Sequence, residues 1–103
     1  MRRGTTPTNT FSVPIDLSAA TVFITYAQSG RTVIEKTGDD LTFDSTDGYK
    51  IIVELSQQDT LAFMSGAVEI QIRCVFESGE ALASNIIRTT FDRILKDGEI
   101  EYV

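Results

Sequence analysis

Four aspartates are the residues of this chain whose types and spacing first suggest chemistry. Asp39, Asp40, Asp44 and Asp47 fall close together around one short stretch, and carboxylate oxygens are ligands that Ca²⁺ prefers. Their spacing fits no calcium-binding loop, and aspartates in loops or beside glycine are ordinary turn formers. We therefore expect turn residues here and no metal site, while calcium binding by these acidic loops stays an open alternative.

Histidine is absent from the sequence, which removes much nucleophilic and metal chemistry. One chain then cannot form a Ser–His or Cys–His pair or a His-based zinc site. The single cysteine, Cys74, lies on the apolar side of an alternating stretch, so we expect a small core residue rather than a reactive thiol. A paired-carboxylate active site needs a cleft, and a domain this small has little room for one. We predict no enzyme activity, no catalytic residues, no cofactor and no small-molecule substrate.

Composition describes one acidic domain. A chain of 103 residues that is 42% apolar can bury a core without staples. Its net charge of −6 argues against a nucleic-acid partner, since phosphate contacts need clustered Lys and Arg. Residues 4–9 are polar where a signal peptide would be apolar, and no long apolar run follows. We therefore expect no secretion signal, no membrane insertion and a cytoplasmic location.

The most regular pattern in the chain predicts a β-hairpin over residues 68–91. Apolar and polar residues alternate from Val68 to Phe76, which is the period of a half-buried strand. We place a two-residue turn at Ser78-Gly79. The resulting pairs are Phe76 with Ala81, Cys74 with Ala83, Ile70 with Ile87, Val68 with Thr89, and the oppositely charged Glu69 with Arg88.

Further alternating stretches complete an all-β domain. The residues at 21–28 are apolar on both faces, which favours a central strand, and Ser29-Gly30 predicts a second hairpin turn that pairs Tyr26 with Val33 and Thr25 with Ile34. Ser56 and Asp59 have the form of a helix start, so we expect one short helical turn crossing between two sheets. The predicted strands are 10–15, 21–28, 31–36, 41–44, 50–55, 67–76 and 81–91. About seven short strands at this spacing are typical of an immunoglobulin-like antiparallel β-sandwich.

The two termini supply the candidate interface. Residues 1–9 offer little to bury and carry positive charge, which predicts a flexible N-terminal arm before a single domain over 10–103. Residues 92–103 are acidic and partly apolar, and their pattern leaves helix, strand and disorder open. Opposite charges on the two ends suggest head-to-tail contacts between neighbours. The candidate contact residues are Arg2, Arg3, Ile94, Leu95, Ile100 and Tyr102.

Three stretches carry a resemblance to a known group of proteins. They are residues 1–8, residues 61–73 and residues 83–100, the last including Arg93-Ile94-Leu95-Lys96-Asp97-Gly98-Glu99-Ile100. Together they resemble small, largely uncharacterised proteins of about 100 residues encoded in phages and prophages of Gram-positive bacteria, among the virion structural genes. The resemblance implies a tail- or baseplate-associated virion component whose partners are other virion proteins or further copies of itself, present in the host cytoplasm until assembly.

Two other functions compete with that expectation. A binding module for a host cell-surface glycan or protein predicts a concave or aromatic-lined loop surface. A small enzyme or regulator predicts a polar pocket with perturbed carboxylates, and the absence of histidine counts against it. We expect a protein–protein interaction scaffold and keep the surface-binding module as the alternative.

Overall fold

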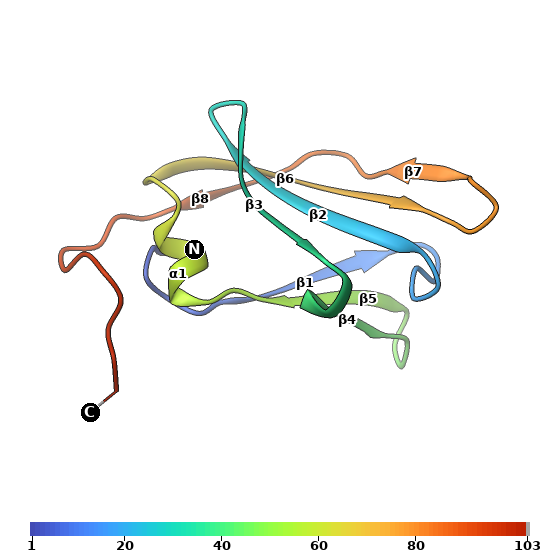
Figure 1. Ribbon diagram of the computed structural model, residues 1–103, viewed down its shortest axis with the longest axis horizontal. Coiled ribbons are helices and arrows are strands. Elements are labelled where there is room, and N and C mark those ends of the chain that lie inside the picture. Colours follow the sequence, from blue (N-terminus) through green and yellow to red (C-terminus); the bar gives the residue numbers. More distant parts are fainter. Residues whose placement is uncertain (103) are drawn as a thin grey trace.

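The described residues, 1–102 of a computed structural model, form eight strands in two antiparallel sheets that lie as two layers (Figure 1). One sheet has the order β1 (Thr8–Val13), β5 (Tyr49–Glu54), β4 (Leu41–Asp44). The other has the order β3 (Arg31–Thr37), β2 (Thr21–Gln28), β6 (Gly66–Val75), with β7 (Ala81–Ala83) and β8 (Ile87–Phe91) both pairing with the far edge of β6. The predicted antiparallel β-sandwich is confirmed.

The strand order is that of an immunoglobulin domain. If β1 is taken as strand B, the first sheet reads B-E-D and the second reads C′-C-F-G, as in a variable-type domain. The short helix α1 (Gln57–Leu61) links β5 of one sheet to β6 of the other, as expected for the helical turn. Within residues 1–102, no strand in the position of strand A pairs with the outer edge of β1.

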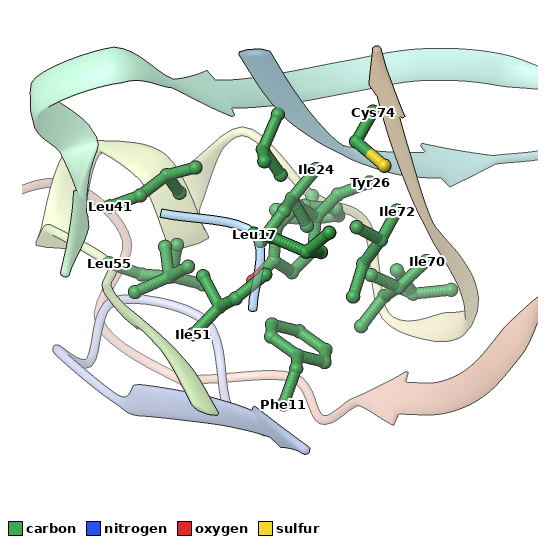
Figure 2. Close-up of a cluster of buried hydrophobic side chains, with 14 of the residues drawn as sticks. Phe11, Leu17, Ile24, Tyr26, Leu41, Ile51, Leu55, Ile70, Ile72 and Cys74 are labelled. Carbon is green, nitrogen blue, oxygen red and sulfur yellow. The ribbon is translucent and has the colours of Figure 1, made fainter. Parts of the chain in front are cut away.

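The core lies between the two sheets and follows the alternation of the strands. Figure 2 shows the side chains of Phe11 and Ile51 from one sheet meeting those of Ile24, Tyr26 and Ile70 from the other. The inward residues expected on β6 are buried, Cys74 included. The expected central strand β2 does lie between β3 and β6, and it supplies two of the fully buried core residues.

An aromatic group closes the core near α1. The Phe63 ring stacks on Phe91 with centroids 4.4 Å apart, and it meets Tyr26 edge-on at 6.2 Å. All three side chains are fully buried. Such pairs add stabilisation beyond the area they bury, so this group ties α1, β2 and β8 together.

The hairpin of β2 and β3 has the predicted turn but not the predicted register. Ser29 and Gly30 both have positive φ, as a two-residue turn with right-handed strand twist requires. A bulge then follows, so Tyr26 pairs with Ile34 rather than Val33, and Thr25 pairs with Glu35 rather than Ile34. The prediction was wrong by one residue because a bulge inserts a residue that alternation alone does not reveal.

The hairpin after β6 also departs from the predicted register, here because of its turn. Near the turn, Cys74 pairs with Leu82 and Val75 with Ala81, so the predicted pairs of Phe76 with Ala81 and of Cys74 with Ala83 are wrong. The amide of Phe76 donates to the carbonyl of Glu80 at 2.9 Å, which makes the turn one residue longer than predicted. Further along, the predicted pairs of Val68 with Thr89, Glu69 with Arg88 and Ile70 with Ile87 are confirmed.

Ser84 marks the place where the two registers meet. Its amide donates to the Ile72 carbonyl at 2.8 Å, and its hydroxyl accepts from the Ile72 amide at 3.0 Å. Asn85 and Ile86 then lie opposite the single residue Gln71, which is a β-bulge. The predicted strand over 81–91 is therefore two strands, β7 and β8.

Several boundaries differ from the prediction. Strand β1 begins at Thr8, inside the expected arm, and ends at Val13, because Pro14 cannot donate to a ladder. A 3₁₀ turn, η1 (Gly38–Asp40), replaces the expected loop after β3. At α1 the predicted start is confirmed, since the Asp59 amide donates to the Ser56 hydroxyl at 3.0 Å and the Ser56 amide donates to the Asp59 carboxylate at 2.9 Å.

No helix among residues 1–102 is long and apolar enough to cross a membrane.

Candidate interaction surfaces

The N-terminal segment, residues 1–7, packs on its own chain instead of extending as an arm. The Met1 amine donates to the Thr90 carbonyl at 2.7 Å, and Arg2 forms a parallel bridge with Asp92 at the end of β8. The Thr60 hydroxyl donates to the Thr5 carbonyl at 2.8 Å. The segment is thus tied to β8 and to α1, and the structure differs here from the expected free arm.

Arg3 is the main anchor of the N-terminal segment. Its guanidinium donates to the carbonyls of Phe63 and Leu61, the second at 3.0 Å, and lies 3.5 Å from the Asp97 carboxylate. These two carbonyls follow or end the short α1, where helix carbonyls lack partners within the helix. The head-to-tail charge pairing expected between copies is thus formed within one chain for Arg3.

Arg2 lies at the same end of the molecule but makes weaker contacts. Its guanidinium donates to the Arg93 carbonyl at 2.8 Å and lies 3.9 Å from the Asp92 carboxylate, and both of these side chains are exposed. Exposed ion pairs contribute little to stability. Arg2 therefore remains available to a partner, whereas Arg3 is occupied.

The C-terminal tail, residues 92–102, has no regular helix or strand, so neither the helix nor the strand considered for it forms. Val103 lies outside the described residues. Ile94 is half-buried and packs close to Gly4, whose φ of +75° and limited space both favour glycine. The tail is held again at Ile100, whose amide and carbonyl both bond the side-chain amide of Gln57, at 2.9 and 3.0 Å. Ile94 thus belongs with the docked residues.

Three predicted contact residues point away from the sandwich. Leu95 is 92% exposed, Ile100 is 58% exposed, and Tyr102 is fully exposed. Figure 1 shows this tail leaving the sandwich near α1 and ending well apart from the sheets. The six predicted residues therefore divide into Arg2, Arg3 and Ile94, which the structure brings together, and Leu95, Ile100 and Tyr102, which it leaves exposed.

A second surface was not predicted. An apolar groove of about 230 Å³ lies between the end of β1 and β7, and we call it the open seam. Leu82 faces inward opposite Cys74, yet it is 43% exposed because the three-stranded sheet does not reach over it. The residues that line the open seam include Val13, Pro14, Ile15, Leu17, Ile72 and Leu82.

One signal in the sequence could have revealed the open seam. Leu82 and Ile87 both face the interior, since they pair with the inward residues Cys74 and Ile70. Five positions separate them, an odd number that strict alternation cannot reconcile with one face. Ser84-Asn85 between them supplies the polar residues of the bulge.

A third surface is a groove of about 730 Å³ beside the β2–β3 turn, lined by both polar and apolar residues, which we call the hairpin groove. The Gln28 side chain bonds the backbone of Met64 twice, at 2.6 and 2.8 Å, and so fixes one wall. Glu69 and Arg88 form the predicted cross-strand ion pair at 3.2 Å along another wall. Two of its three charged side chains, Glu69 and Arg88, thus satisfy one another, while the third, Arg31, forms no ion pair among residues 1–102.

The four aspartates of the acidic loops serve local structure where their contacts are seen. Asp44 accepts from the amide and the hydroxyl of Thr46 at 3.0 and 2.8 Å, and these hydrogen bonds hold the pKa of Asp44 below its usual value. The Asp40 carboxylate accepts from the Thr37 amide at 3.2 Å. Residues 1–102 contain no group of three His, Cys, Asp or Glu side chains arranged to hold a metal ion.

Comparison with known proteins adds only a likeness of fold. No protein-family model matches the chain, and no curated protein matches it. A solved structure described as the V domain of amphioxus IgVJ-C2 is similar over 91% of this chain and 97% of that one, with 14% sequence identity and a TM-score of 0.36. The immunoglobulin-like arrangement rests on the strand order itself, and no activity or partner is transferred from that protein.

Proposed function

We propose that this chain is a non-enzymatic structural component of a phage or prophage virion, associated with the tail or baseplate, and that it acts as a protein–protein interaction scaffold. Its partners are other virion proteins or further copies of itself, which it meets in the host cytoplasm during assembly. The resemblance of residues 1–8, 61–73 and 83–100 to small phage proteins supports the setting. Interaction rather than catalysis is supported by the surfaces of the molecule.

The observation that carries the proposal is the exposed C-terminal tail. Leu95, Ile100 and Tyr102 put three large apolar side chains into water on a segment held mainly through its backbone. Single exposed apolar residues are common, but these three lie on one short segment of the chain, and apolar exposure that is gathered in one region marks interaction sites. A partner that covers these side chains accounts for their position.

Chemistry on this chain has little support from the same surfaces. The Cys74 thiol is buried in the core, and the sequence has no histidine. In the hairpin groove, the charged pair Glu69–Arg88 is already satisfied. A scaffold needs a stable sandwich with accessible edges and termini, and this chain offers both.

The experiment is mass spectrometry of gradient-purified particles from the strain that carries the gene. Peptides of this chain should be found in the particles together with the other structural proteins. A chain carrying Leu95→Ser and Tyr102→Ser should be produced at normal levels and be depleted from particles, whereas Phe23→Ser, which changes a 39% exposed residue on the outer face of β2, should enter normally. Finding the protein in the lysate but not in particles would overturn the proposal.

The alternative function, recognition of a host cell-surface glycan or protein, is favoured by one observation. The hairpin groove is larger than the open seam and lies beside a turn, and loops are where binding residues of sandwich domains lie. No aromatic residue is among those lining it, all of which belong to the described part of the chain. A glycan array with wild type and Arg31→Ala would decide, since saccharide binding lost in the variant would favour this function over the scaffold.

A further inference from the structure

The open seam separates two strand edges that have no partner. The outer edge of β1 pairs with no other strand of residues 1–102, and neither does the outer edge of β7. Unpaired edges offer a row of backbone donors and acceptors to an added strand. Between these edges the floor is apolar and includes Ile72 and Leu82. An added strand would find backbone partners at its side and an apolar floor below it.

On the side of β7 and β8, residues at the start of the chain already pair with part of the sheet edge. Met1 to Arg3 run beside the end of β8, where the Asp92 amide donates to the Met1 carbonyl at 2.8 Å and the Arg3 amide donates to the Asp92 carbonyl at 3.1 Å. Strand addition at this edge is therefore a contact that the fold uses. The half beside β7 lacks such a cover within the described residues.

The C-terminal tail has the pattern that the open half requires. Glu99, Ile100, Glu101 and Tyr102 alternate acidic and apolar side chains. In an extended strand, Ile100 and Tyr102 would point to one face and the two glutamates to the other. Recognition by strand addition works in this way, with backbone bonds for affinity and alternate side chains in pockets for specificity.

The tail of the same molecule is in the wrong place to fill the seam. Figure 1 shows β7 at one end of the long axis and the C-terminus at the other, in a molecule 47 Å long. The bonds between Ile100 and Gln57 hold the tail beside α1. A tail that fills the seam would therefore belong to another molecule.

We propose that the open seam binds the C-terminal tail of a second copy of this chain as an added strand, with Ile100 and Tyr102 seated against Leu82. Seam and tail are different surfaces, so the contact is heterologous and joins copies head to tail into a chain or a ring. The inference rests on the proposed function, because it names the partner of the tail that the proposed scaffold uses.

Sedimentation velocity of the full-length protein tests the inference. Wild type should form species larger than a dimer as its concentration rises. Leu82→Glu, which puts a charge into the seam, and Tyr102→Ser, which shortens the tail contact, should each weaken association by about tenfold or more. Phe23→Ser changes a residue of similar exposure on the outer face of the same five-stranded sheet, away from the seam, and should associate as wild type does.

Mixing the two variants separates this contact from other modes of association. Leu82→Glu retains a tail and Tyr102→Ser retains a seam, so the mixture should form one-to-one dimers and stop there. A mixture of Leu82→Cys and Tyr102→Cys chains should give a reducible cross-link under mild oxidation, since disulfides need Cα atoms within about 7 Å. This second readout does not require the charged variant to fold, and the native Cys74 is buried.

Three results would overturn the inference. They are a wild type that stays monomeric at high concentration, a variant mixture that forms neither dimers nor cross-links, and symmetric dimers that Tyr102→Ser leaves intact, which would indicate pairing of β7 edges. If one of these results accompanied normal incorporation into particles, the proposed virion function would stand and only the head-to-tail contact would fall.

Discussion

The two ends of the sandwich differ in how the gap between the sheets is closed. Near α1, the N-terminal segment covers β8, Arg3 bonds two carbonyls, and the Phe63–Phe91 stack fills the interior. Near β7, an inward residue such as Leu82 stays 43% exposed beside two free strand edges. We call the region near α1 the docked end. The chain's own residues cover the gap between the sheets there, whereas in our proposal a second molecule covers it at the open seam.

The two regions also differ in how many polar side-chain contacts hold them. At the docked end the Tyr26 hydroxyl donates to the Asn9 side chain at 2.7 Å, and Lys36 lies 2.8 Å from the Asp59 carboxylate. Burial, and then the nearby Asp59 charge, raise the pKa of Tyr26 above its usual value, so this hydroxyl remains a donor. The open seam has an apolar lining and offers few such bonds. Stability should therefore concentrate at the docked end and association at the open seam.

The largest expected effect of a single change comes from Phe63→Ala. Removing this fully buried ring leaves a cavity against Phe91 and Tyr26, so the free energy of unfolding should fall by about 3 to 5 kcal/mol. Leu82→Ala in the open seam should cost about 1 kcal/mol or less, because its side chain is already partly in water. Urea denaturation of both variants checks the contrast, and equal losses would contradict it.

Arg3→Ala should have the next largest effect. The variant leaves two partly buried carbonyls, those of Phe63 and Leu61, without their charged donor. The free energy of unfolding should therefore fall by about 2 to 3 kcal/mol. Arg2→Ala is the matched control and should change it by less than about 1 kcal/mol, since Arg2 is exposed. Thermal and urea unfolding measure the stability of both variants. If Arg3→Ala were as stable as wild type, the contacts of Arg3 would not hold the N-terminal segment, and the flexible arm expected from sequence would be favoured.

Asp59→Asn should have a smaller and pH-dependent effect. Burial raises the pKa of this carboxyl, but bonds from Lys36 and Ser56 and the Lys36 charge outweigh it and lower the pKa below 3.8. A lowered folded-state pKa gives stability that is full above the unfolded-state pKa and is lost as pH falls through the folded-state value. The variant should lose about 1 to 2 kcal/mol near neutral pH, because it keeps an oxygen that can accept from the Ser56 amide but loses the charge that faces Lys36.

The control for Asp59→Asn is the pH series itself. The difference in urea midpoint between wild type and variant should narrow as pH falls from about 6 to about 3, because the unfolded-state carboxylate then takes up a proton more readily than the folded-state one. Asp44→Asn, at another carboxyl with a lowered pKa but on an exposed loop, should show a smaller difference throughout. A constant gap between wild type and Asp59→Asn at every pH would contradict the assignment.

Most of the strands were predictable from sequence because alternation is a local signal. The pattern from Val68 to Cys74 located β6, and Ser56 with Asp59 located the start of α1. Alternation carries no information about extra residues, so the predicted register fails beyond the bulge in the β2–β3 hairpin and beside the longer turn in the β6–β7 hairpin. The docking of Arg3 was not predictable, since its two carbonyl acceptors are distant in sequence and their free lone pairs come from the end of α1. The exposed tail residues were predicted as contacts, and the open seam was missed because it depends on which edge lacks a neighbour.

The bulge at Ser84 offers the smallest and most local test. Ser84→Ala removes the hydroxyl that accepts from the Ile72 amide, so the free energy of unfolding should fall by about 1 kcal/mol. Hydrogen exchange at the Ile72 amide should quicken, while exchange at Ile24, in the middle of β2, should change only with global stability. Because the bulge is what turns Leu82 into the open seam, a loosened bulge should also weaken association. If exchange at Ile72 were unchanged, the Ser84 hydroxyl would not stabilise the bulge. The backbone pairing of Leu82 with Cys74 and of Ile87 with Ile70 would then be enough to keep Leu82 facing the open seam.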